Sequence, residues 1–418
     1  MSGGMEARQG HSSVQEAAGS PPPLRPAGSA SEVLRTFLKL GLTSFGGPIA
    51  HLGYFRDELV LRRKWISETE YADLVALCQF LPGPASSQVG FALGLLRAGF
   101  PGACAAWTAF TLPSALLLIL FAFGAAEFGG PVGTGLIHGL KIVAVAVVAQ
   151  AVWGMAQRLT PDRRRAGIGL AAALAVIFIG SAVGQIAAIV CGALAGLWLC
   201  RDLPVPDSDH LAFPISRRVG VTALALFFVL LLFLPVVSDM LSWRGLTLFD
   251  SFYRAGALVF GGGHVVLPLL QAEVVQTGWV GADSFLAGYG AAQAVPGPLF
   301  TFAAYLGAVM KSPPNGVEGA VICLIGVFLP GLLLVVGALP FWSAFRIRPW
   351  AQAAMRGANA AVVGILAAAL YDPVWTSAIL NSRDFALALT GFLLLTVWQT
   401  PPWIVVLALA CGGVALAL

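Results

Sequence analysis

Apolar stretches of membrane-helix length dominate the chain, and short polar or glycine- and proline-rich segments separate them. The pattern predicts about thirteen helical segments. They cover residues 31–61, 71–97, 100–126, 132–157, 166–180, 183–200, 219–237, 250–276, 283–310, 317–341, 350–370, 385–398 and 403–418. Because a membrane helix needs ~20 apolar residues, we expect an all-α polytopic membrane protein.

Residues 1–30 are rich in Ser, Gly, Pro, Ala and Gln and contain no apolar core of a signal peptide. We expect them to form a disordered cytoplasmic tail.

Composition supports a membrane protein. Of 418 residues, 58% are hydrophobic and only 11% are charged, whereas soluble domains are about 25% charged. The net charge of +4 falls mostly in a few loops, so it indicates membrane topology rather than nucleic-acid binding. The six cysteines are scattered through apolar runs without a CxxC or Cys/His cluster, which gives no reason to expect a metal or a disulfide.

Two motifs of the first half return in the second half. Phe45-Gly46-Gly47-Pro48 returns 215 residues later as Phe260-Gly261-Gly262-Gly263, and we name these segments the glycine breaks. Pro82-Gly83-Pro84 returns 214 residues later as Pro296-Gly297-Pro298, and we name these the Pro-Gly-Pro turns. Weaker matches link Leu112-Pro113 with Leu329-Pro330, Gly139 with Gly357, and Cys191-Gly192 with Cys411-Gly412. Such spacing indicates an internal duplication.

The duplication predicts the domain organisation. Residues 31–200 and 247–418 are two repeats of about six segments each, and residues 201–246 are a linker with one transmembrane helix. One linker helix between six-segment repeats would insert the second repeat upside down, as in many secondary transporters. The N-terminus would then be cytoplasmic and the C-terminus periplasmic.

Basic residues support this orientation in part. The cytoplasmic side would receive Arg158, Arg163, Arg164, Arg165, Arg201, Arg217, Arg218, Arg346 and Arg348. Arg62-Arg63-Lys64 does not fit. Either the first segment fails to span the membrane or this patch is an exception.

The Pro-Gly-Pro turns must interrupt helices, because proline removes a backbone donor. Residues 71–81 and 85–97 are each too short to cross a ~30 Å hydrocarbon core, so we expect a broken helix or a re-entrant hairpin. The half-helix that begins at Ala85 would direct free N–H groups and a positive dipole end at an oxyanion, assisted by Ser86 and Ser87. The alternative is a kink that serves packing alone.

Glycine breaks allow positive φ and close backbone approach, or serve tight helix packing instead. His51 and His264 follow the two breaks and could titrate near neutral pH, although a lone histidine is more often structural.

Charged residues also match between the halves. Lys39 aligns with Arg254, and Glu58 aligns with Glu273, both at an offset of 215. The cations could attract an anion or simply reach the membrane interface. Glu58 has Arg62 at i+4, whereas Glu273 has Thr277 there. Glu273 is therefore the better candidate for proton coupling, ahead of Glu58 and His51.

Lys141 lies inside an apolar segment, and its counterpart is Asn359. This asymmetry suggests a cation that only one repeat keeps.

Together these residues define a candidate substrate site near the membrane midplane. It comprises Lys39, Gly46, Gly47, Pro82, Gly83, Pro84, Ser86, Ser87, Arg254, Gly261, Gly262, His264, Pro296, Gly297, Pro298 and Thr301. No nucleotide-binding, zinc-protease or nucleophile-elbow motif appears, so we expect a transporter without cofactors rather than an enzyme.

The glycine breaks and Pro-Gly-Pro turns resemble those of the chromate ion transporter (CHR) family, in its long-chain, two-domain form. The resemblance covers the chain after residue 30. It implies a bacterial inner-membrane protein that exports chromate by the proton motive force and confers chromate resistance, with sulfate as the expected competitor. A homodimer is possible.

The residues by themselves leave two alternatives open. One is import of sulfate or another anion, and the other is a passive anion channel. A channel needs no coupling carboxylate, so it should tolerate Glu273→Gln.

Overall fold

The computed structural model describes residues 28–125, 130–179, 182–201, 215–260, 263–342 and 348–418, and these ranges contain helices and no strands. The predicted tail lies almost entirely outside them. Within these ranges, five helices are long and apolar enough to cross a membrane, namely α4, α5, α8, α13 and α15. The all-α membrane architecture is confirmed.

The helices follow the predicted order. The first half contains α1 (Ala30–Thr43), α2 (Gly47–Phe55), the π-helical turn η1 (Arg56–Arg62), α3 (Glu68–Phe80), α4 (Ala85–Ala125), α5 (Gly130–Leu159), α6 (Arg163–Ile179) and α7 (Ala182–Leu199). Next comes α8 (Arg217–Leu241). The second half contains α9 (Arg244–Ala257), η2 (Gly263–Val265), α10 (Val266–Val274), α11 (Ala282–Ala292), η3 (Leu299–Thr301), α12 (Phe302–Ala308), α13 (Gly316–Ala338), η4 (Leu339–Phe341), α15 (Pro349–Ala369), η5 (Leu370–Trp375), α16 (Thr376–Ala378), α17 (Ser382–Thr396) and α18 (Pro402–Ala417).

Helices end where the glycines and prolines predict. At the first glycine break Gly46 and Gly47 adopt positive φ of 97° and 76°, which separates α1 from α2. α3 ends at Phe80 and α4 begins at Ala85, on either side of the first Pro-Gly-Pro turn.

α4 is not one straight helix. Gly99 has a positive φ of 63°, and Ala98 also leaves the helical region. Gly94 lies against Gly102 and Ala106 across this bend. Residues 85–97 therefore fold back on residues 100–125, so the half-helix after the first Pro-Gly-Pro turn does not cross the membrane alone.

The first predicted segment, residues 31–61, is divided at the glycine break into pieces that are each too short to span. α1 has 14 residues, and α2 and η1 have 9 and 7, so the pieces are ~21 Å and ~24 Å long against a ~30 Å hydrocarbon core. These lengths favour the first explanation of the Arg62-Arg63-Lys64 patch, in which the segment before it does not cross.

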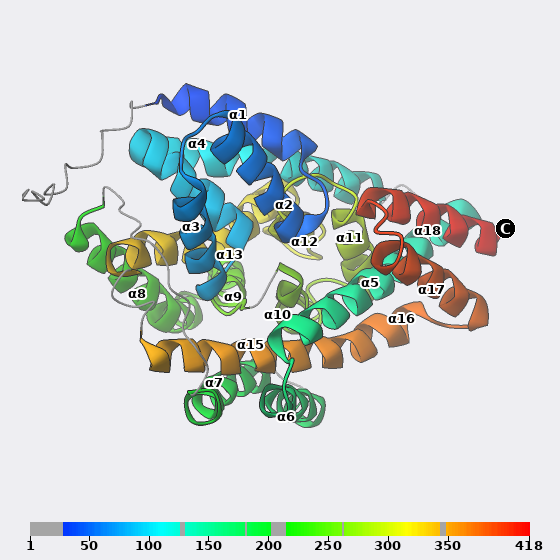
Figure 1. The fold of residues 1–418 in the computed structure, drawn as a ribbon. Coiled ribbons are helices and arrows are strands. Elements are labelled where there is room, and N and C mark those ends of the chain that lie inside the picture. Colours follow the sequence, from blue (N-terminus) through cyan, green and yellow to red (C-terminus); the bar gives the residue numbers. More distant parts are fainter. Residues whose placement is uncertain (1–27, 126–129, 180–181, 202–214, 261–262, 343–347) are drawn as a thin grey trace, which may run out of the picture.

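The two repeats exchange helices. α5 of the first repeat packs against α17 and α18 of the second, and α15 of the second packs against α6 and α7 of the first. Figure 1 shows α6 and α7 below α15, and α17 and α18 beside α5. α1 packs on α4 just as α9 packs on α13. The matched pairs show that the duplication extends to the packing.

Matched glycines hold these exchanged helices close together. A Cβ at Gly139 would lie 2.6 Å from Leu409 O of α18, and a Cβ at Gly357 would clash with Gly192 O of α7. Small residues let helices approach in a membrane, where dispersion contacts rather than water exclusion drive packing. The sequence match between Gly139 and Gly357 thus corresponds to two equivalent helix crossings.

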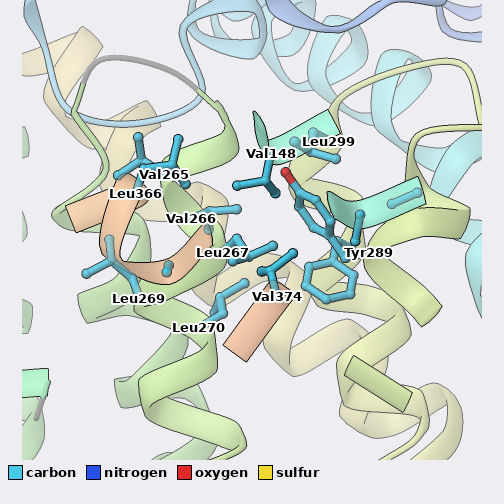
Figure 2. Packing of buried hydrophobic residues seen from close by; sticks show 14 of the residues in the cluster. Val148, Val265, Val266, Leu267, Leu269, Leu270, Tyr289, Leu299, Leu366 and Val374 are labelled. Carbon is cyan, nitrogen blue, oxygen red and sulfur yellow. The ribbon is translucent and has the colours of Figure 1, made fainter. Parts of the chain in front are cut away.

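The largest core cluster is shared by both repeats. It joins Val148 of α5 to residues of η2, α10 and α15. In Figure 2, Val148, Leu299 and Tyr289 lie to the right of Val265, Val266 and Leu366 of the same cluster. The repeats therefore share one packed core, which includes the short helices α10, α11 and α12 of the second repeat.

Candidate functional site

The glycine breaks and Pro-Gly-Pro turns meet across the repeats. Gly83 N–H donates to Val259 O at 2.7 Å, and Gly297 N–H donates to Ser44 O at 2.9 Å. Val259 and Ser44 are the residues just before the two glycine breaks. Each Pro-Gly-Pro turn thus binds the glycine break of the other repeat, and we name this region the crossing.

Each Pro-Gly-Pro turn also touches the proline-containing helix of the other repeat. A Cβ at Gly83 would lie 3.0 Å from Gly331 Cα in α13, and one at Gly297 would lie 2.9 Å from Ser114 Oγ in α4. Both glycines have positive φ, 122° and 97°. Glycine is required at both positions by backbone conformation and by space.

The α4 helix starts at the crossing. Gln88 N–H is the first amide of the helix to find a backbone acceptor, at 2.9 Å from Pro84 O. Pro84 has no side-chain acceptor. Within the part of the chain that the structure describes, the amide groups of residues 85–87 have no acceptor, so they are free donors at the positive dipole end.

Buried polar side chains lie on the segments that meet at the crossing. We name as the polar cluster the residues Ser44, His51, Ser86, Ser87, Gln88, Thr111 and Ser114, all of which are buried. His51 Nδ1 lies 3.3 Å from Ser86 Oγ. Gln88 Nε2 donates to Pro82 O and to Gly331 O of the other repeat. No member is a carboxylate or a cation other than a protonatable His51.

Several atoms of the polar cluster have no hydrogen-bond partner among the residues that the structure describes. They are Ser44 Oγ, His51 Nε2, Ser87 Oγ, Gln88 Oε1 and Thr111 Oγ1. Each unsatisfied buried group costs ~1–3 kcal/mol, so natural proteins retain few of them without a role. Ser87 and Gln88 belong to the first turn of α4, and His51 contacts Ser86, whereas Ser44 accepts from Gly297 of the other turn. Unsatisfied buried groups gathered on the segments of the crossing are typical of a site for a polar ligand.

The counterpart in the second repeat is less polar. Thr301 Oγ1 donates to Pro298 O at 2.7 Å, and His264 Nδ1 lies 2.8 Å from the Tyr289 hydroxyl. Leu299 and Phe300 stand where the first repeat has Ala85 and Ser86. The two halves of the crossing are thus unequal. Gly261 and Gly262 lie outside the described residues.

The matched charges pair with each other. Lys39 Nζ lies 2.9 Å from Glu58 Oε2, and Arg254 lies 3.3 Å from Glu273 Oε2. Glu273 thus finds on α9 the basic partner that its own helix lacks. In the described parts of the chain no hydrogen bond or ion pair joins Lys39 or Arg254 to the polar cluster.

These two ion-pair clusters differ in net charge. Glu58 also pairs with Arg62 at 3.0 Å and Arg63 at 2.8 Å, so three cations surround one carboxylate. Arg254 also pairs with Asp250 at 3.1 Å, so one cation lies between two carboxylates.

Glu58 lies in η1, outside the five long apolar helices. Its burial alone would raise its pKa, but hydrogen bonds from Arg63, Lys39 and Arg62 outweigh burial and lower the pKa to about 2. Glu58 therefore stays ionised at physiological pH.

Lys141 lies away from the crossing, in an ion pair between the repeats. Its Nζ lies 2.8 Å from Asp283 at the start of α11. One turn earlier, His138 Nε2 lies 2.9 Å from the buried Asp384 of α17. Sequence reasoning missed both carboxylates because they are 142 and 246 residues from their partners.

Sequence reasoning also missed Ser44, Thr111 and Ser114 of the polar cluster. One signal could have found Ser114, since it directly follows the matched Leu112-Pro113.

Comparison with known proteins gives one family. A family model described as "Chromate transporter" matches residues 31–197 and 246–414. The matched regions correspond to the two repeats and leave out α8. No solved structure matches the chain at a significant level.

Curated relatives agree with that match. The chromate transport protein of Pseudomonas aeruginosa is 28% identical over 411 residues, covering 94% of this chain and 92% of that protein. The chromate transport protein of Cupriavidus metallidurans is 26% identical, covering 82% of each. The transporter YwrB of Bacillus subtilis is 33% identical over 173 residues, which cover 83% of that protein but 39% of this chain. The YwrB alignment is about as long as one repeat.

Proposed function

This chain belongs to the chromate transporter family, and from that premise we propose that it is a secondary active transporter that exports chromate, driven by the proton motive force. We place it in the bacterial inner membrane with a cytoplasmic N-terminus and a periplasmic C-terminus. The observation that carries the proposal is the start of α4, where residues 85–87 have no acceptor for their amides among the described residues and adjoin the buried polar cluster at the crossing.

The polar cluster suits a tetrahedral dianion. A buried anion is tolerated only when hydrogen bonds replace its hydration. The amides of residues 85–87 and the hydroxyls of Ser86 and Ser87 would supply donors, and the helix dipole contributes about half a positive charge. His51 Nε2, which has no partner among the described residues, would donate a further bond as one tautomer. The polar cluster contains no carboxylate, so no ionised group in it repels the anion.

The cluster around Arg254 supports the assignment of Glu273 as the proton carrier. Asp250 and Glu273 share one guanidinium, so the cluster carries one excess negative charge that a proton on a carboxylate would neutralise. Glu58 faces three cations and keeps its charge, so it is the poorer carrier.

Alternating access would follow from the two repeats. If the second repeat is inverted, the Lys39–Glu58 and Arg254–Glu273 pairs lie at opposite faces of the membrane. Rocking of one repeat against the other at the crossing would open one pair at a time. The remaining candidate residues, Gly46, Gly47 and His264, would shape the backbone and walls of this path.

Two other functions use the same site. Import of sulfate would reverse the direction, because sulfate shares the charge and shape of chromate. A passive anion channel would need no coupling carboxylate. The paired carboxylates around Arg254 favour the coupled carrier over the channel.

The deciding experiment measures labelled chromate uptake into inverted vesicles that contain the full chain. We expect energised uptake that a protonophore abolishes and that excess sulfate reduces. Vesicles without the protein are the control. Uptake that ignores the protonophore would exclude proton coupling, and uptake seen only in right-side-out vesicles would indicate import.

A further inference from the structure

A groove distinct from the crossing lies between α4, α8 and α13. Its volume is about 640 Å³, within the ~300–1,000 Å³ of typical ligand pockets. Phe91, Phe100, Trp107 and Phe328 line it together with aliphatic side chains, and Arg218 is the only charged lining residue. A hydrated oxyanion would lose its hydration in this groove without gaining hydrogen bonds from the apolar lining.

The groove exists because α8 stands apart from α4. α8 packs on α13 and α9, with Gly220 against Pro340 and Gly337. Only 22% of its most apolar stretch is buried, against 61% for α13. α13 therefore forms the floor of a cleft whose two walls are α4 and α8.

The lining is arranged from a charged end to an apolar end. Arg218 and Val219 stand at the start of α8, and Leu226 lies two turns further on. α13 runs the opposite way, because Gly220 meets Gly337. No carboxylate pairs with Arg218 within the described ranges, and its side chain is exposed.

We propose that this groove binds an anionic phospholipid. Arg218 pairs with the phosphate, assisted by the positive end of α8, and one acyl chain lies along Trp107, Leu226 and Phe328. Inorganic phosphate could pair with Arg218 but would make no contact with the apolar lining of the groove. A zwitterionic lipid fills the walls but offers no net negative charge.

The groove lies at the linker helix α8 and not at the crossing, so the lipid would bind at a different place from the transported ion. α8 lies outside both regions that the family model matches, so the groove has no counterpart in the second repeat. The lipid would join α8 to α4 and so fix the linker against the first repeat. This inference holds whether or not the chain exports chromate.

Native mass spectrometry of the detergent-purified full chain tests the proposal. Phosphatidylglycerol, phosphatidylcholine with the same acyl chains, and inorganic phosphate are added separately, and the retained adducts are counted. We expect one phosphatidylglycerol to be retained in preference to the others. Arg218→Gln should weaken retention about fivefold, the contribution of one basic residue at an anionic surface.

Two matched variants make the test specific. Arg217→Gln removes a neighbouring charge that does not line the groove, and it should retain the lipid. Cys104→Trp fills the groove and should lose the lipid with Arg218 intact, whereas Cys191→Trp on α7 should not. Equal retention of both lipids, or equal loss in Arg217→Gln and Arg218→Gln, would overturn the anionic-headgroup assignment. Lipid retained by Cys104→Trp would overturn the location, and preference for inorganic phosphate would overturn the lipid.

Discussion

Ser87 and Thr301 occupy matched positions after the two Pro-Gly-Pro turns, yet their hydroxyls have different roles. Thr301 donates to Pro298 O, whereas Ser87 Oγ has no partner within the part of the chain that the structure describes. A hydroxyl already satisfied by backbone has little to offer a ligand. At this matched position, the two repeats therefore differ by one hydrogen bond between a hydroxyl and the backbone.

We expect Ser87→Ala to weaken chromate binding and to leave folding intact. The lost hydrogen bond to a charged ligand is worth ~1–3 kcal/mol, or roughly a 5- to 150-fold rise in KM. The melting temperature should not fall, because the unpaired buried hydroxyl stabilises nothing in the free protein. Thr301→Ala is the matched control and should leave KM nearly unchanged. Equal effects on KM in the two variants would contradict the assignment.

The matched carboxylates Glu273 and Glu58 should have different roles in transport. We expect Glu273→Gln to abolish the response of transport to an imposed pH gradient, because it removes the carboxylate that a proton would neutralise. Glu58→Gln should keep that response but lower thermal stability, since it leaves Lys39, Arg62 and Arg63 without their shared partner. Because Lys39, Arg62 and Arg63 are 51%, 66% and 31% exposed, each lost pair should cost only ~0.2–1 kcal/mol.

Transport in vesicles with and without a pH gradient, together with melting curves, measures both effects. A Glu273→Gln protein that still responds to the gradient would refute its role as the carrier.

At the scale of elements, glycines decide how closely helices pack. Gly357 of α15 lies against the backbone of Gly192 and Gly196 in α7. Nothing lies within 4 Å of a Cβ built at Gly154 of α5. Gly357 and Gly154 both lie within long helices that match between the repeats. They differ mainly in whether another helix packs against them.

We therefore expect Gly357→Ala to destabilise the protein by ~1–3 kcal/mol through overpacking. Gly154→Ala should be neutral or stabilise by ~0.5–1 kcal/mol, as alanine favours helix. Thermal unfolding in detergent measures both changes. Similar melting temperatures for the two variants would show that α15 and α7 can move apart to accommodate the alanine methyl group without loss of stability.

At the scale of the whole molecule, the exchange of helices makes each half dependent on the other. α5 of the first half packs against α17 and α18 of the second half, and α15 of the second half packs mainly against α6 and α7 of the first. The two hydrogen bonds of the crossing also join different repeats. A half-chain on its own would expose these faces.

We expect a chain cut between residues 201 and 215 to work only when both pieces are co-expressed. Neither piece alone should yield a monodisperse, folded protein, and the two should co-purify and restore transport. Size-exclusion chromatography and vesicle uptake measure this outcome. A single piece that is stable and active as a monomer would contradict the packing.

The sequence alone determined the class, the duplication and the breaks in the helices. Hydrophobic runs predict membrane helices because the bilayer core admits few alternatives. Gly46, Gly83 and Pro84 predict breaks because their backbone chemistry is local. The offset of 215 also paired Lys39 with Arg254 and Glu58 with Glu273.

Only the tertiary structure decided which matched residues touch. Sequence alignment places Gly83 opposite Gly297, but the structure joins Gly83 to Val259 and Gly297 to Ser44. It likewise turns matched charges into ion pairs and assembles the polar cluster from three separate segments. Contacts between residues hundreds of positions apart depend on how helices cross, and helix crossing is set by packing of many small residues at once. No local pattern in the chain carries that information.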